Sequence, residues 1–188
     1  MAYTFGYILS SKMSKARLVT TTALFTATLI CVQLALSGVG GVELVTVFFL
    51  AFCFYMGIRA GVAVAICFSL LRCFLFGFYP SVIILYLIYY PLFALFFGWF
   101  GNKFGHKITN VKFFFIVLFA VIFTAFFSML DCAITPIIYG FNNRTWLAYV
   151  YSALPFMGTQ IACVIISVSI LFIPLVKGFE KIQHYSHT

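Results

Sequence analysis

The sequence predicts an all-α membrane protein that crosses the bilayer six times. Of its 188 residues, 65% are hydrophobic and only 7% are charged. A soluble domain covers its surface with about 25% charged residues, so a chain of this composition cannot present its exterior to water. Because about 20 apolar residues span a bilayer, the chain holds about six crossings with short connections. We expect one compact bundle and no soluble catalytic domain.

Helix-breaking residues divide the apolar sequence into six segments. A glycine-rich connection that includes Gly40 follows the first segment, and Gly57 and Gly61 mark a tight turn after the second. Pro80 lacks the amide donor that a continuing helix needs, so it separates the third segment from the fourth. The last segment is long and contains two prolines, which predict a loop or interfacial turn at its start and a kink within it. The predicted spans are 18–36, 42–58, 60–78, 81–100, 113–135 and 147–176.

Basic residues set the predicted orientation. If the N-terminus is cytoplasmic, the outer loops receive only Arg144, whereas the inner side receives Lys12, Lys15, Arg17, Arg59, Lys103, Lys107, Lys112, Lys177 and Lys181. The positive-inside rule therefore places both termini in the cytoplasm. Loops 37–41, 79–80 and 136–146 are then external.

This orientation divides the chain into three parts. Residues 1–17 form a cytoplasmic N-terminal segment, 18–176 a six-helix substrate-binding domain in the membrane, and 177–188 a cytoplasmic tail. The net charge of +8 would suggest a nucleic-acid partner in a soluble chain. Here the basic residues sit mostly at helix ends, so we expect contacts with membrane lipid and none with nucleic acid.

Polar chemistry is gathered in the predicted outer half of the bundle. The charged residues Glu43, Arg72 and Asp131 all fall there, and charges within a membrane are costly unless they are paired or face water. Two interpretations stay open: an aromatic belt with a structural Arg72–Asp131 ion pair, or a small-molecule pocket. The other polar and aromatic residues of this half are Gln33, Tyr79, Tyr86, Tyr89, Tyr90, Tyr139, Asn142, Asn143, Arg144, Trp146, Tyr149 and Tyr151.

The residues argue against an enzyme. All three histidines fall on the predicted cytoplasmic side, so no serine within the membrane has a histidine base and no histidine cluster can hold a catalytic metal. One acid per helix does not supply paired carboxylates. A channel needs a polar stripe through both leaflets, and a self-sufficient transporter usually shows repeated halves. We therefore expect no catalytic residues, no metal and no covalently bound cofactor.

The first predicted helix carries a stripe of small residues along one face. The stripe consists of Thr20, Ala23, Ala27 and Cys31. Small residues at steps of three and four let two helix backbones approach closely in a membrane. A second stripe, on the third helix, consists of Gly61, Ala65 and Ser69. If the second stripe serves internal packing, the first is free to face another protein.

Together these features resemble the substrate-binding S components of energy-coupling factor (ECF) vitamin transporters. The likeness covers nearly the whole chain: six helices, both termini inside, a glycine-containing outer loop before the second helix, and an Ala-x-x-x-Ala motif at 23–27. The stretches VELVT at 42–46 and GIRAG at 57–61 also look like members of this family.

The resemblance implies a multi-pass subunit of the bacterial plasma membrane. Such a subunit captures a vitamin at the outer face and docks through its first helix on a transmembrane coupling subunit driven by two cytoplasmic ATPases. This chain has no G-x-x-x-x-G-K-[ST] phosphate loop, so ATP would be bound and hydrolysed only by partner subunits.

The resemblance also implies where the vitamin binds. The pocket would include Gln33, Gly40 and Glu43 around the first outer loop, with Arg72 as a ligand or as a residue that orients Asp131. Its other residues would be Tyr86, Tyr90, Asp131, Asn142, Asn143, Arg144, Trp146 and Gln160. Cobalamin is the first choice of substrate, followed by riboflavin, pantothenate, folate and a pyridoxine or thiamin precursor. A non-transport membrane assembly subunit is the alternative class.

Overall fold

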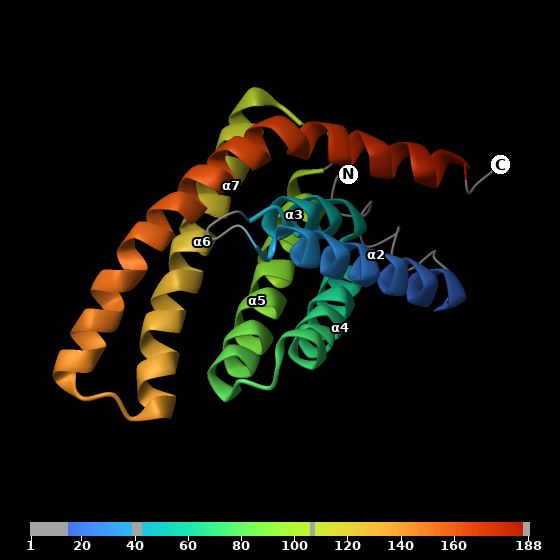
Figure 1. Ribbon diagram of the computed structural model, residues 1–188. Helices are drawn as coiled ribbons and strands as arrows, with labels where there is room; N and C mark the ends of the chain where they lie inside the picture. Colours follow the sequence, from blue (N-terminus) through green and yellow to red (C-terminus); the bar gives the residue numbers. More distant parts are fainter. Residues whose placement is uncertain (1–14, 39–42, 106–107, 186–188) are drawn as a thin grey trace.

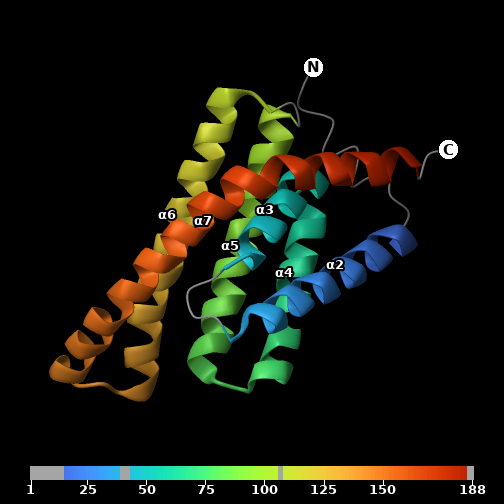
Figure 2. The same cartoon turned by 45° about the horizontal axis from the view of Figure 1, so that its top comes forward.

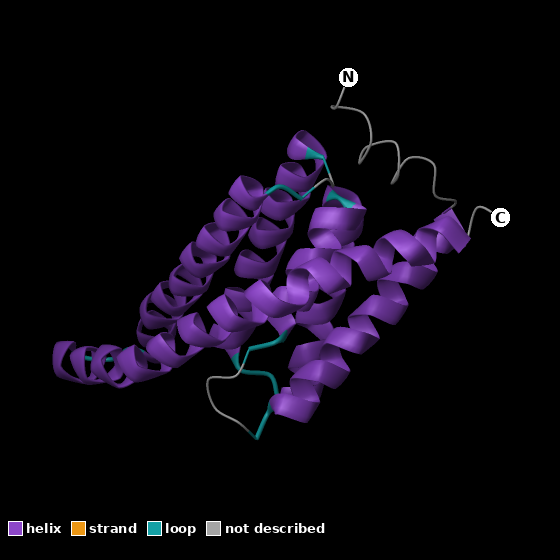
Figure 3. Ribbon diagram, turned by 90° about the horizontal axis from the view of Figure 1, so that it is seen from above, coloured by secondary structure: helices purple, strands orange, loops and turns teal. Residues whose placement is uncertain are grey.

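The computed structural model describes residues 15–38, 43–105 and 108–185. Within these ranges the chain forms six α-helices and no strand (Figure 3). The helices are α2 (Lys15–Leu36), α3 (Val45–Met56), α4 (Ile58–Phe76), α5 (Pro80–Phe104), α6 (Asn110–Tyr139) and α7 (Asn143–Tyr185). The all-α class predicted from composition is therefore confirmed.

Five of these helices, all except α3, are long and apolar enough to cross a membrane. The chain is thus a multi-pass membrane protein by the length and composition of its helices. The exception, α3, has 12 residues and is about 18 Å long, whereas the hydrocarbon core of a bilayer is about 30 Å thick. The span predicted over 42–58 is therefore longer than the helix that forms, and among the described residues the predicted count of six spans is not confirmed.

Gly57 explains why α3 ends early. Its φ of 81° and ψ of −176° lie in a region that is essentially restricted to glycine. Its backbone N–H donates a hydrogen bond to the Cys53 carbonyl oxygen at 3.0 Å, which closes the last turn of α3. Because α4 begins at the next residue, the turn is one glycine, and Gly61 of the predicted turn is already helical.

The two C-terminal helices are longer than predicted. Pro136 lies inside α6, and Pro155 and Pro174 lie inside α7, which runs without interruption from its first residue to its last. The predicted loop at the start of this segment is wrong, and the predicted tail is helical up to residue 185. Figures 1 and 2 show that α7 changes direction along its length, as expected of a helix with internal prolines.

The short helix α3 occupies the centre of the structure. It packs against α5, α7 and α4, and ten of its 12 residues are buried. Helix α2 crosses α4 obliquely, and α6 pairs with α7 as a hairpin (Figure 2). The turn of this hairpin lies apart from the turn between α4 and α5 (Figure 1).

The outward faces of the helices are apolar. The side chains of Phe74, Met129, Ile137 and Ile170 are each at least 64% exposed. Soluble monomers rarely expose apolar patches of this extent, whereas lipid acyl chains match them. The exposed surface therefore agrees with the membrane location predicted from composition.

Gly98 of α5 lies directly against the turn between α3 and α4. A Cβ atom added at Gly98 would lie 2.7 Å from the backbone nitrogen of Ile58 and 2.9 Å from its Cα. Because backbone atoms cannot move aside cheaply, we expect Gly98→Ala to destabilise the fold by about 1–3 kcal/mol. The measurement is the midpoint of thermal unfolding in detergent, which should fall.

Gly158→Ala is the matched control, because a Cβ at this position of α7 meets nothing within 4 Å. Alanine forms helices better than glycine, so this change should leave the midpoint unchanged or raise it. Equal losses for the two variants would contradict the close approach of α5 to the turn.

Candidate solute-binding site

A cavity of about 490 Å³ lies at the end of the bundle where α2 ends and α5 begins. Its walls come from all six described helices and from the segment leading into α3, so it joins residues from nearly the whole chain. Its volume is within the range of about 300–1,000 Å³ that is usual for small-molecule sites. The lining residues are Gln33, Leu36, Ser37, Glu43, Val45, Arg72, Phe76, Val82, Leu85, Tyr86, Tyr90, Phe127, Asp131 and Gln160.

The structure brings six of the predicted binding residues together in this cavity. They are Gln33, Glu43, Arg72, Tyr86, Tyr90 and Asp131. Gln160, which the resemblance also implies, lines the cavity as well. The three charged residues of the predicted outer half thus share one site, while Gly40 lies outside the described residues.

Arg72 approaches the cavity along an aromatic surface. Its guanidinium carbon lies 4.0 Å from the centroid of the Tyr86 ring and 5.2 Å from that of Phe76. The faces of aromatic rings attract cations, so these contacts stabilise the charge. The buried Nε atom has no hydrogen-bond partner, and within the described residues Arg72 forms no ion pair. The predicted Arg72–Asp131 ion pair is therefore not formed.

Asp131 is held instead by hydroxyl groups of the α6–α7 hairpin. The Thr135 hydroxyl donates to Oδ1 at 2.9 Å, and the Tyr149 hydroxyl donates to Oδ2 at 2.6 Å. The bond from Tyr149 crosses from α7 to α6. Both carboxylate oxygens of Asp131 therefore have donors within the protein.

Glu43 is the centre of a second polar network. One carboxylate oxygen, Oε2, accepts from the Thr46 hydroxyl at 3.1 Å, and the other accepts from Nε2 of Gln160 at 3.4 Å. The Gln160 carbonyl oxygen in turn accepts from the Ser128 hydroxyl at 3.2 Å, and the Glu43 backbone N–H points to the Cys163 sulfur at 3.3 Å. These bonds attach the segment before α3 to both α6 and α7.

Sequence reasoning overlooked part of this polar face. Thr124, Ser128, Asp131 and Thr135 follow each other at steps of three and four along α6, which places them on one side of the helix. A polar stripe of this spacing in an apolar helix is a readable signal. It would have identified Ser128 and Thr135 as partners of the cavity residues.

The aromatic wall of the cavity comes from α5. Tyr86 and Tyr90 are one helical turn apart, their ring centroids are 5.1 Å apart, and Tyr86 also contacts Phe127 at 5.6 Å. Both tyrosines are at most 6% exposed, whereas Tyr79 is 57% and Tyr151 is 70% exposed. The belt interpretation therefore suits Tyr79 and Tyr151, and the pocket interpretation suits the two buried rings.

The remaining predicted residues lie at the turn of the α6–α7 hairpin and do not line the cavity. They are Asn142, Asn143, Arg144 and Trp146, and all are exposed. Asn142 Oδ1 accepts a hydrogen bond from the Thr145 backbone N–H at 2.9 Å, which caps α7. Trp146 Nε1 donates to the Cys132 carbonyl oxygen at 3.0 Å, which fastens the turn to α6.

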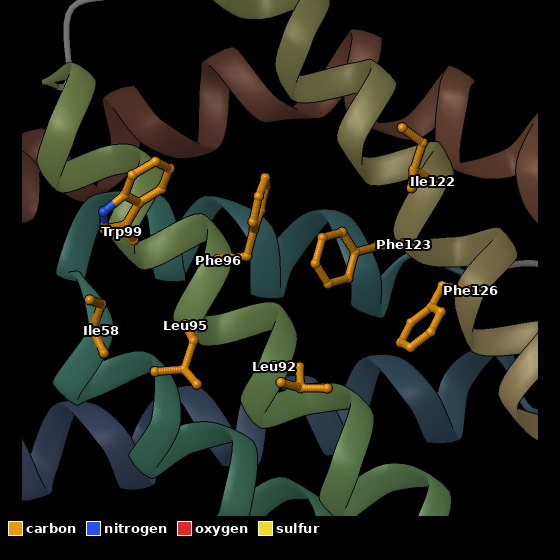
Figure 4. Close-up of a pocket in the computed structure, with 8 residues that line it drawn as sticks. All are labelled: Ile58, Leu92, Leu95, Phe96, Trp99, Ile122, Phe123 and Phe126. Atoms are coloured by element: carbon orange, nitrogen blue, oxygen red, sulfur yellow. The ribbon is translucent and has the colours of Figure 1, made fainter.

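A second, larger cavity of about 680 Å³ is almost entirely apolar. Figure 4 shows its side chains projecting from α5 and α6, with one from the start of α4. They are Ile58, Leu92, Leu95, Phe96, Trp99, Ile122, Phe123 and Phe126. A specific small-molecule site also needs a few convergent polar groups, which this cavity does not offer. The smaller polar cavity is therefore the better candidate site.

The small-residue stripe of the first helix is exposed in the structure. Thr20, Ala23, Ala27 and Cys31 all lie on the open face of α2, while Phe25 and Leu29 are buried on its other face. The second stripe is buried inside the chain and consists of Gly61, Ala65 and Ser69. The two stripes thus have the different environments that the sequence led us to expect.

No family model, curated protein or solved structure matches the chain. Among residues 15–38, 43–105 and 108–185, no group of three or more His, Cys, Asp or Glu side chains could hold a metal ion. Function must therefore be inferred from the polar cavity and from the exposed face of α2.

The hydrogen bond between Tyr149 and Asp131 should contribute to stability. Tyr149→Phe removes the donor and leaves a carboxylate oxygen without a partner, which costs about 1.5–3 kcal/mol. The midpoint of thermal unfolding should fall. Tyr151→Phe on the same helix is the control, since Tyr151 is 70% exposed. An unchanged midpoint for Tyr149→Phe would show that this bond does not hold the hairpin together.

Proposed function

We propose that the chain is the substrate-binding S component of an ECF-type importer. It binds a vitamin in the polar cavity and delivers it through a transmembrane coupling subunit driven by two ATPases. The observation that carries the proposal is a polar cavity in a chain with 7% charged residues. Its polar groups belong to Gln33, Glu43, Arg72, Asp131 and Gln160.

The free-energy cost of placing polar and charged side chains within the membrane favours a binding role for them. Charged residues within a membrane are costly unless they are paired or face water. Glu43 in the segment before α3, Arg72 on the apolar helix α4 and Asp131 on the apolar helix α6 meet in this one cavity. A purely structural network would satisfy its own hydrogen bonds. Arg72 Nε and Gln33 Oε1 instead stay without partners, which is the pattern expected of a site that is completed by a ligand.

The exposed stripe on α2 supports the transport half of the proposal. Apolar helices gain little from hydrophobic contact inside a bilayer, so association depends on close backbone approach at small residues. Ala23 and Ala27 are exposed and one turn apart, so they leave room for a partner helix. The expected partner is the coupling subunit, and the expected location is the bacterial plasma membrane.

The volume of the cavity favours the smaller vitamins. Sites for drug-sized ligands enclose about 300–1,000 Å³, and this one encloses about 490 Å³. Cobalamin is much larger than a drug-sized molecule, so most of it would remain outside. Riboflavin, pantothenate, folate and the pyridoxine or thiamin precursors are therefore preferred substrates.

Expression of the chain together with an ECF coupling subunit and its ATPases tests the proposal. We expect the three components to co-purify with the chain and the isolated chain to bind one of these vitamins in calorimetry. A well-folded chain that neither binds a vitamin nor retains the ATPases would instead be a membrane assembly subunit.

Docking and solute binding should be separable. We expect the double variant Ala23→Leu, Ala27→Leu to bind the vitamin as tightly as the unchanged chain, because neither residue lines the cavity. Vitamin uptake should be lost, since leucine side chains hold the partner helix away from α2.

Ala162→Leu is the matched control, because Ala162 is an exposed alanine on α7 and outside the cavity lining. It should leave both binding and uptake intact. Parallel loss of binding and uptake in the double variant would mean that the stripe stabilises the chain itself. Unchanged uptake would remove the docking role of α2.

A further inference from the structure

Some polar groups of the cavity have hydrogen-bond partners within the protein, and others have none. The carboxylate oxygens of Glu43 and Asp131 already accept hydrogen bonds from side chains of the protein. Arg72 Nε is a buried donor without an acceptor, and Gln33 Oε1 is a buried acceptor without a donor. Among the described residues, these two are the buried polar atoms of the cavity lining that stay without a hydrogen-bond partner.

We propose that the solute is a small monocarboxylate that also carries a hydroxyl or amide N–H. Its carboxylate pairs with Arg72, and its O–H or N–H donates to Gln33. The inference rests on the proposed function, because it takes the polar cavity to be the solute site. It adds the chemical class of the substrate.

A carboxylate is the anion that suits Arg72. The planar guanidinium presents its donors as a fork that matches two carboxylate oxygens, and such charge-assisted bonds are among the strongest in proteins. The Tyr86 ring lies against the guanidinium and stabilises its charge, yet Nε still has no acceptor. The ligand supplies the missing oxygen.

The two acids favour a ligand with one negative charge over a ligand with two. Glu43 and Asp131 line the same cavity as Arg72, so a doubly charged phosphate would be repelled more strongly than a carboxylate. Both acids already accept hydrogen bonds within the protein, and a cationic ligand would leave Arg72 Nε without an acceptor. A neutral one would leave it without a charged acceptor.

Pantothenate is the probe that fits these requirements. It has one carboxylate, an amide N–H and hydroxyl groups, and it is small enough for the cavity. Pantothenol has the same skeleton with an alcohol in place of the carboxylate, so the pair isolates the contribution of the negative charge. Biotin and biotinamide form a second pair on a different skeleton.

Calorimetry on the full chain in detergent compares the members of each pair. We expect a carboxylate to bind at least about tenfold more tightly than its neutral partner. Arg72→Gln should abolish this difference, and Arg72→Lys should retain part of it because the charge remains. Arg59→Gln is the control, since Arg59 is exposed near the opposite end of α4 and does not line the cavity.

The pairs test the inference on the unchanged chain, so the result does not depend on the folding of the Arg72 variants. The chain could bind riboflavin, pyridoxine or cobalamin and yet bind neither pantothenate nor biotin more tightly than its neutral partner. That result would overturn the inference and leave the proposed function intact. A preference that persists in a monodisperse Arg72→Gln variant would also overturn it. Failure to bind any vitamin would overturn both the inference and the proposed function.

Discussion

The inability of lipid to satisfy polar groups is the constraint on which this structure depends. Every backbone amide within the hydrocarbon must find a partner in the chain, which accounts for the purely helical structure of the described residues. The same constraint acts on side chains. Glu43, Arg72 and Asp131 come from distant parts of the sequence and meet in one cavity, where they contact protein groups instead of lipid.

The scaffold around the cavity is built from aromatic packing and close backbone contacts. The chain contains 26 phenylalanines, and several of them surround the central helix α3. At the end of α3, Gly57 turns the chain sharply into α4, and Gly98 lets α5 approach this turn. The aromatic rings and the turn hold α5 in place, so Tyr86 and Tyr90 are positioned by packing in the interior of the protein.

Sequence patterns predicted the all-helical class, and six of the residues that they singled out line one cavity, because both features follow from where polar residues can be tolerated. They did not predict the length of α7, because Pro155 and Pro174 break helices in water but are accommodated within long membrane helices. Nor did they separate the hairpin turn at Asn142 and Trp146 from the cavity. That separation depends on how far the α6–α7 hairpin diverges from α5, which is a property of tertiary packing.

The central claim is that the polar cavity, and no other part of the chain, holds the solute. An experimental structure of the chain, purified from cells and saturated with the vitamin that binds it, tests this most directly. We predict solute density between Gln33, Arg72 and Gln160, with the solute against the Tyr86 side of the cavity. Solute density at the exposed hairpin turn near Trp146, with Arg72 turned to pair with Glu43, would contradict the claim.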